Sequence, residues 1–155
     1  MKRFFTVTAL ALTMACFSTT ASAQEFSGLD KSPMDMASYP SSYRVSDKAV
    51  RVTYSRPQLK GRSLADLCPA GKVWRTGANE AAEITFYKDV DFAGKAVEAG
   101  TYSLFTIPGA EEWTVILNKN LNQWGAYSYD EGADVARVTV PSSAGGDSLE
   151  AFSIA

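Results

Sequence analysis

The stretch Val50-Arg51-Val52-Thr53-Tyr54-Ser55 alternates apolar and polar side chains with a period of two. Successive side chains of a strand point to opposite faces of a sheet, so this pattern predicts a strand with one buried face. The same alternation recurs in residues 83–87 and 113–118. Further strand candidates are residues 72–75, 96–97, 101–107, 125–129, 134–140 and 148–154.

Residues that favour turns separate these strand candidates at short intervals. Pro57, Gly77 and the Pro108-Gly109 pair are examples. Only residues 63–67 and a turn near Leu121 have a helical pattern. Many short strands with almost no helix predict an all-β protein, a single-domain antiparallel β-sandwich of the jelly-roll or immunoglobulin-like kind.

The N-terminus has the three parts of a secretory signal peptide. Lys2 and Arg3 precede an apolar stretch over residues 4–17, and Ala21-Ser22-Ala23 supplies a cleavage site of small residues. We therefore expect residues 1–23 to be removed and the protein to be periplasmic or secreted. The apolar stretch is too short for a transmembrane segment. An alternative is lipid attachment at Cys16, although the preceding residues lack the leucine usual at such sites.

The remaining chain divides into a leader and a domain. Residues 24–44 are rich in Ser and Pro without sustained periodicity, which predicts an extended linker. Residues 45–155 carry the strand pattern and are predicted to form one β-sandwich domain around a single core. Cys68 is the only cysteine left after removal of the signal peptide, so no intramolecular disulfide is expected.

Charge is distributed unevenly along the chain. Removing Lys2 and Arg3 with the signal peptide leaves 13 cations against 17 acids, a net charge of −4, which argues against a nucleic-acid partner. Residues 44–75 hold eight cations against two acids, whereas residues 76–155 hold twelve acids against four cations. This asymmetry indicates either cross-strand charge pairing between the two halves or a local anion site.

The block Trp74-Arg75-Thr76-Gly77-Ala78-Asn79-Glu80 places an indole, a cation, an amide and a carboxylate around one glycine. Guanidinium groups match carboxylates or phosphates, and an indole suits the apolar face of a sugar. The alternative is structural: Arg75 pairs with an acid, Asn79 closes a turn and Trp74 packs in the core. The candidate ligand-binding residues are Arg56, Lys60, Arg62, Trp74, Arg75, Asn79, Glu80 and Trp124.

Several sequence blocks occur together from about residue 45 onward. They are Tyr54-Ser55-Arg56-Pro57, Lys60-Gly61-Arg62, residues 74–80, 99–109 and 113–119, and Trp124-Gly125-Ala126-Tyr127 followed by Tyr129-Asp130. With these blocks in this order, the chain resembles the domain of unknown function 2911 family. This resemblance implies an exported, mostly β protein, often from bacteria with an outer membrane, and no established activity that could be transferred.

Two departures from the family pattern concern packing and length. Cys68 and Ala70 stand where the family usually has a large apolar or aromatic pair. Family members normally continue well past the strand that begins near Ser148, whereas this chain stops at Ala155. This comparison implies that one or two closing strands are missing and that a sheet edge is exposed.

The absence of histidine limits the chemistry that the chain can support. Ser-His-Asp and Cys-His catalysis and the usual zinc, copper and non-haem iron sites are excluded. A carboxylate-based hydrolase would use Glu80 with Glu83, Asp130 or Asp134. Calcium binding around Gly132 by Asp130, Glu131 and Asp134 is another reading, but a solvated turn explains that segment better.

We therefore expect no catalytic residue, no metal ligand and no cofactor. The sequence predicts a non-catalytic exported module that binds a small anion or a polar saccharide. The alternatives are a carboxylate-dependent hydrolase acting on glycans and a structural interaction module of the cell envelope. The sequence does not predict an oligomeric state.

Overall fold

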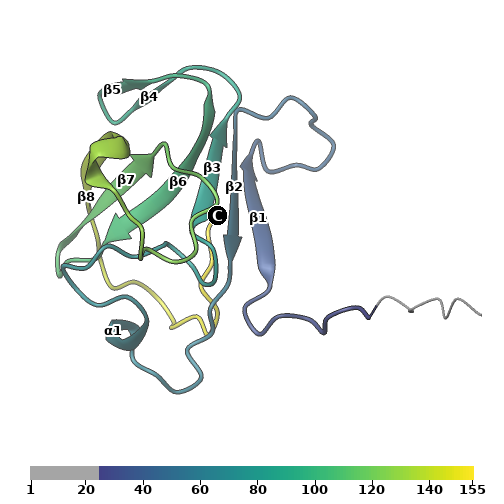
Figure 1. The fold of residues 1–155 in the computed structure, drawn as a ribbon, viewed down its shortest axis with the longest axis vertical. Coiled ribbons are helices and arrows are strands. Elements are labelled where there is room, and N and C mark those ends of the chain that lie inside the picture. Colours follow the sequence, from purple (N-terminus) through teal and green to yellow (C-terminus); the bar gives the residue numbers. More distant parts are fainter. Residues whose placement is uncertain (1–24) are drawn as a thin grey trace, which may run out of the picture.

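A computed structural model describes residues 25–155, and it consists mainly of antiparallel β-sheet. Six strands form one sheet in the order β1-β2-β3-β6-β7-β8, and a separate hairpin, β4-β5, lies over one end of it (Figure 1). The predicted all-β, sandwich-like fold is confirmed. The sheet strands are β1 (Met34–Tyr39), β2 (Val50–Ser55), β3 (Ala82–Phe86), β6 (Gly100–Ile107), β7 (Glu112–Asn118) and β8 (Asp134–Pro141), and the hairpin strands are β4 (Val90–Phe92) and β5 (Lys95–Val97).

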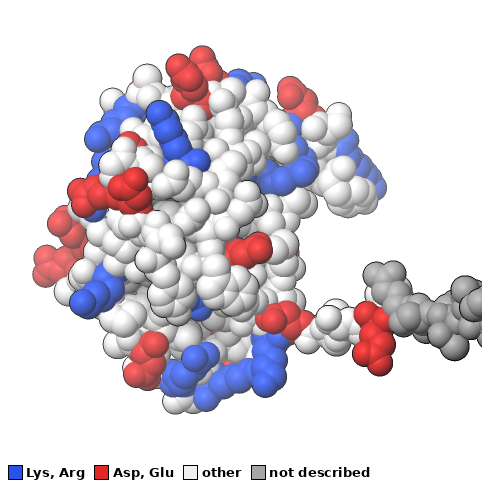
Figure 2. Space-filling view, viewed as in Figure 1, with Lys and Arg blue, Asp and Glu red and all other residues white. Residues whose placement is uncertain are grey.

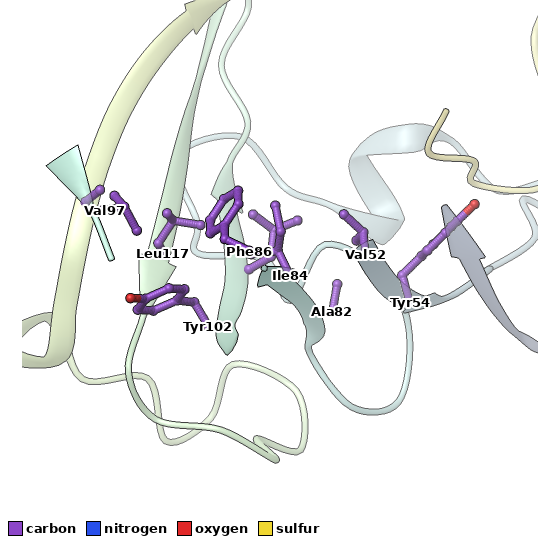
Figure 3. Close-up of a cluster of buried hydrophobic side chains, with 10 residues drawn as sticks. Val52, Tyr54, Ala82, Ile84, Phe86, Val97, Tyr102 and Leu117 are labelled. Atoms are coloured by element: carbon purple, nitrogen blue, oxygen red, sulfur yellow. The ribbon is translucent and has the colours of Figure 1, made fainter. Parts of the chain in front are cut away.

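The larger hydrophobic core lies on one face of the sheet. Alternate side chains of β2, β3, β6 and β7 point into it, as the period-two pattern predicted. Figure 3 shows these side chains in a row, with Val97 of the hairpin at one end and Tyr54 at the other. The hairpin and the C-terminal segment cover this face. The core members are Val52, Tyr54, Ala82, Ile84, Phe86, Val97, Tyr102, Leu104, Leu117 and Ala136, with Phe92, Phe152 and Ile154 packed against them.

The opposite face of the sheet carries a smaller core, formed by Ala81, Phe105 and Ile116, and loops cover it. Asn118 fastens one of these loops, because its amide donates to the carbonyl of Asp130 and to the Asp134 carboxylate. Phe105 and Ile116 are fully buried because β6 and β7 are covered on both faces. The hairpin and the C-terminal segment thus cover the larger core, and loops cover the smaller one.

The short helix α1 (Leu64–Leu67) and the 3₁₀ turn η1 (Glu131–Ala133) are the helical elements of residues 25–155. Ser63 and Asp66 cap α1 reciprocally: the Ser63 side chain accepts from the Asp66 N–H, and the Asp66 side chain accepts from the Ser63 N–H. The helical pattern expected at residues 63–67 is therefore confirmed. Neither element has the length or the apolar composition needed to cross a membrane.

The structure differs from the sequence-based expectation at several segments. Strand β1 lies inside the segment expected to be a linker and pairs with β2 along its whole length. Residues 125–129 form turns, because Gly125 has a φ of +68°. Residues 72–75 and 148–154 each contribute a single bridge, Trp74–Thr106 and Gln58–Ala151. The expected signal peptide and Cys16 lie outside the described residues.

Candidate functional site

The eight candidate residues divide into separate groups, and Arg56 belongs to a structural one. Its Nη1 pairs with the Asp35 carboxylate at 3.0 Å, its Nε donates to the carbonyl of Phe152 at 2.9 Å, and its Nη2 donates to Ser153 Oγ at 2.7 Å. All three nitrogens of the guanidinium therefore have partners within the protein. Arg56 ties β1 and the C-terminal segment to the end of β2.

Lys60 and Arg62 lie in the loop that precedes α1. The Lys60 N–H donates to the Glu150 carboxylate, and the Arg62 guanidinium donates to the carbonyls of Gln58 and Leu59. Figure 2 shows that Lys and Arg side chains gather at the end of the molecule where Figure 1 places α1. The Arg62 side chain therefore closes a turn, and the Lys60 backbone, rather than its ammonium group, holds the C-terminal segment.

Trp74 is part of the protein interior. It is 7% exposed, and its ring packs edge-to-face against Trp113 and Phe152 at centroid distances of 6.3 and 5.1 Å. Its backbone exchanges two hydrogen bonds with Thr106 of the central strand β6. These contacts match the structural reading of this tryptophan.

Arg75 follows Trp74 and is half-buried. Its Nε is buried without a hydrogen-bond partner in the described part of the chain, which also contains no ion pair between Arg75 and Glu80. The pairing that the structural alternative expected for Arg75 is therefore not present within residues 25–155.

Asn79, Glu80 and Trp124 form a second group, which the backbone brings together. The Ala81 N–H donates to the Gln123 carbonyl at 2.8 Å, and the Gly125 N–H donates to the Asn79 carbonyl at 2.9 Å. These bonds flank an antiparallel bridge between Glu80 and Trp124. The Trp124 backbone is thus fixed, while its side chain is 64% exposed.

The local sequence explains why residues 76–80 turn at this point. A Cβ on Gly77 would lie 2.9 Å from the Ser55 carbonyl oxygen, so only glycine allows this approach to the end of β2. Thr76 and Asn79 have φ values of +53° and +60°. Asparagine tolerates this left-handed conformation better than most residues, whereas threonine does so at a cost. The Thr76 hydroxyl lies 3.2 Å from that of Thr106.

Trp124, Asn79 and Glu80 line a cavity of about 300 Å³. A neighbouring cavity of about 240 Å³ shares Glu80, Ser55 and Met34 with it, and we call the two together the Trp124 cleft. The residues that line the cleft come from the segment before β1, from β1 itself, from β2, from residues 79–81 before β3, from β3, and from the loop after β7. They are Asp30, Ser32, Met34, Thr53, Tyr54, Ser55, Asn79, Glu80, Ala81, Glu83, Asn122 and Trp124.

Strand register explains the floor of the cleft. Met34 pairs with Ser55, and Thr53 pairs with Glu83, so these side chains alternate with the core residues and point to the other face of the sheet. Ser55 is 5% exposed and lines both cavities. Within residues 25–155 the buried side-chain atoms that lack a hydrogen-bond partner are Arg51 Nε and Arg75 Nε, and neither residue lines the cleft.

The cleft contains carboxylates and no lysine or arginine. Asp30 Oδ1 accepts hydrogen bonds from the Ser32 N–H at 2.6 Å and from Asn79 Nδ2 at 3.1 Å. These hydrogen bonds hold the pKa of Asp30 below its usual value. Glu83 accepts from the Asn122 N–H at 2.9 Å. Glu80 has neither a hydrogen-bond nor an ion-pair partner among the described residues.

The other acids considered as partners of Glu80 have structural roles. Asp134 accepts from Asn118, Tyr129 and Arg137, and Asp130 accepts from the Gly132 N–H. Burial raises the pKa of Tyr129, and the hydrogen bond to Asp134 adds to this effect. Residues 25–155 contain no group of three or more Cys, Asp or Glu side chains arranged to hold a metal ion.

Sequence reasoning named Asn79, Glu80 and Trp124 as ligand-binding residues and Glu83 as a possible acid partner of Glu80, and it missed the rest of the lining. Asp30, Ser32 and Met34 lie in the segment expected to be a linker, so no site was sought there. Ser55 stood in a strand pattern that showed which face it would occupy but not what would cover that face.

Comparison with known protein families agrees with the blocks noted in the sequence. A family model described as Protein of unknown function (DUF2911) matches residues 32–155. Because the match covers most of the chain, the protein belongs to this family. The matched region begins before β1, which is therefore part of the family domain. Comparisons with curated proteins and with solved structures gave no match.

Proposed function

We propose that this protein is an exported, non-catalytic module that binds a polar saccharide in the Trp124 cleft. The observation that carries the proposal is the Trp124 side chain, a large aromatic surface left 64% exposed although its backbone is held on both sides. An exposed indole offers a flat surface for the apolar face of a sugar ring.

The polar groups around Trp124 support a saccharide as the ligand. Ser55 and Thr53 provide hydroxyls, Asn79 an amide oxygen, and Glu80 a carboxylate without a partner in residues 25–155. Sugar hydroxyls donate and accept hydrogen bonds, and a cleft with several such groups beside an aromatic ring matches that chemistry.

The same cleft does not favour the small anion that the sequence also suggested. Arg56 and Arg62 use their guanidinium groups inside the protein, and neither lines the cleft. An anion in the cleft would instead meet carboxylates, which disfavours binding because like charges repel.

Calorimetric titration of the purified protein with short oligosaccharides tests the proposal. Neutral β-1,4- and α-1,4-linked glucose oligomers and N-acetylglucosamine oligomers are suitable probes. We expect binding that Trp124→Ala weakens about tenfold or more, as for a contact worth about 1.4 kcal/mol. Tyr127→Ala is the matched control, because Tyr127 is an exposed aromatic residue of the same loop that does not line the cleft. Equal losses in both variants, or no binding of any saccharide, would refute the proposal.

Export rests on the signal-peptide pattern of residues 1–23. Expression with its own N-terminus in a bacterium with an outer membrane should yield a periplasmic protein whose mass corresponds to a chain beginning at Gln24. A cytoplasmic protein that retains residues 1–23 would contradict export without bearing on the cleft.

A further inference from the structure

The charge of the Trp124 cleft narrows the kind of saccharide that it fits. Three carboxylates line it, those of Asp30, Glu80 and Glu83, and no lysine or arginine does. Asp30 and Glu83 are held by hydrogen bonds from Ser32, Asn79 and Asn122. The donors are neutral, so these hydrogen bonds hold the carboxylates in position and leave their negative charge in place.

Glu80 is the carboxylate best placed to meet a ligand. It lines both cavities of the cleft, and its backbone pairs with that of Trp124. It has no ion-pair or hydrogen-bond partner anywhere in residues 25–155. The loop geometry therefore places an exposed carboxylate that has no protein partner next to the one exposed indole of the described chain.

Ser55 also lines both cavities of the cleft and is 5% exposed. Its hydroxyl can donate and accept hydrogen bonds, as the hydroxyl groups of a sugar do.

We infer that the ligand carries a protonated amine beside a sugar ring, so that it is an amino sugar or an oligomer of one. This inference rests on the proposed saccharide-binding function. The ammonium group pairs with Glu80 and lies against the Trp124 indole, whose negative face attracts a cation. The sugar ring spans the cleft, and a ring hydroxyl bonds the Ser55 hydroxyl.

Binding of three matched oligosaccharides tests the inference. The probes are β-1,4-linked oligomers of glucosamine, N-acetylglucosamine and glucose of equal length, titrated calorimetrically at low and at physiological ionic strength. We expect the glucosamine oligomer to bind about two- to fivefold more tightly than the other two, the margin of one exposed cation–π or ionic contact. This margin should shrink as salt is added, because salt screens exposed charges.

The Glu80→Gln variant tests whether the preference for the glucosamine oligomer arises in the cleft. It keeps the size of the side chain and removes its charge, so the preference for glucosamine should disappear while binding of the glucose oligomer persists. Glu98→Gln changes the net charge equally at an exposed residue that does not line the cleft, and it should leave the preference intact. Thermal unfolding of both variants checks that they are folded.

The failures of the two proposals are distinguishable. Equal affinity for all three oligomers, or a glucosamine preference that survives Glu80→Gln, overturns the amine inference and leaves saccharide binding in place. No binding of any of the three overturns the amine inference, and it removes the saccharide proposal with it if the broader set of neutral probes also fails.

Discussion

Trp74 and Trp124 were both candidate flat surfaces for a ligand, and the fold gives them opposite environments. Trp74 pairs with the central strand β6, and its ring is enclosed by Trp113 and Phe152. Trp124 pairs with Glu80 at the edge of the 74–80 block, and its ring is left in solvent. The same type of side chain stabilises the core at one site and faces a cleft at the other because their backbone partners differ.

Charged residues repeat this contrast. Arg56 has a protein partner for each guanidinium nitrogen, whereas Glu80 has none in the described structure. A polar side chain whose hydrogen bonds are all made inside the protein stabilises the fold, and one that lines a cavity without partners remains available to a ligand. The Arg56 and Arg62 side chains therefore stabilise the fold, and the Trp124 cleft is the candidate site.

Trp74→Ala should have the largest effect on stability. Truncating a buried tryptophan removes its contacts and leaves a cavity, so we expect a loss of about 3–5 kcal/mol in the free energy of unfolding. Urea unfolding followed by far-UV circular dichroism measures it. Trp124→Ala is the control and should change stability by less than about 0.5 kcal/mol. Similar losses in the two variants would erase the contrast between the tryptophans.

Gly77→Ala should come next, because it disturbs the turn that positions the cleft. The new methyl group would lie 2.9 Å from the Ser55 carbonyl, and relieving that clash should cost about 1–3 kcal/mol. Because the Ser55 hydroxyl lines the cleft, saccharide affinity should fall as well. Gly61→Ala is a control for the loss of a glycine, although its φ of +77° adds backbone strain without a steric clash. A Gly77→Ala variant with unchanged stability and affinity would show that this close approach is unimportant.

The strand pattern was predictable from sequence because it depends on local alternation. Residues 50–55, 83–87 and 113–118 alternate and form β2, β3 and β7. Strand β1 was missed because Met34–Tyr39 is an edge strand with no buried residue and is flanked by serine and proline. Residues 125–129 are rich in tyrosine, which favours strands, but the left-handed Gly125 turns the chain.

The cleft was only partly predictable because it depends on contacts between distant segments. Asn79, Glu80 and Trp124 stood in polar and aromatic blocks that indicated a site. Asp30 and Ser55 join them only because β1 pairs with β2 and because residues 79–81 pair with residues 123–125. The periodic pattern of the sequence does not show which of these distant segments pair with each other.

Arg56→Ala should lower stability by about 1–2 kcal/mol, because it breaks an ion pair and two further hydrogen bonds that solvent partly screens. Urea unfolding measures the loss. Asp35→Asn removes only the charge of one partner and should cost less than about 1 kcal/mol. Saccharide affinity of the folded Arg56→Ala protein should stay at the wild-type value, since Arg56 does not line the cleft. Loss of affinity without loss of stability would return Arg56 to the list of ligand-binding residues.

The smallest predicted effect is the titration of Asp30 at the rim of the cleft. The Ser32 N–H and the Asn79 amide donate to its carboxylate and lower its pKa from the usual 3.8. A group whose pKa is lower in the folded state stabilises that state above its unfolded pKa. Its contribution is therefore present at neutral pH and is lost as the pH falls below 3.8 and through the folded pKa.

Carbon-detected NMR titration of the Asp30 carboxylate measures this pKa directly. Asn79→Ala removes the side-chain donor and should raise the pKa part of the way toward its usual value, because the Ser32 N–H still donates. Ser63→Ala is the matched control: it removes a side-chain hydrogen bond from Asp66, so it should raise the pKa of Asp66 and leave that of Asp30 unchanged. If the pKa of Asp30 did not respond to Asn79→Ala, the segment before β1 would not be held against the cleft in solution. Asp30 would then no longer count among its carboxylates, and the preference for an amine would depend on Glu80 and Glu83 alone.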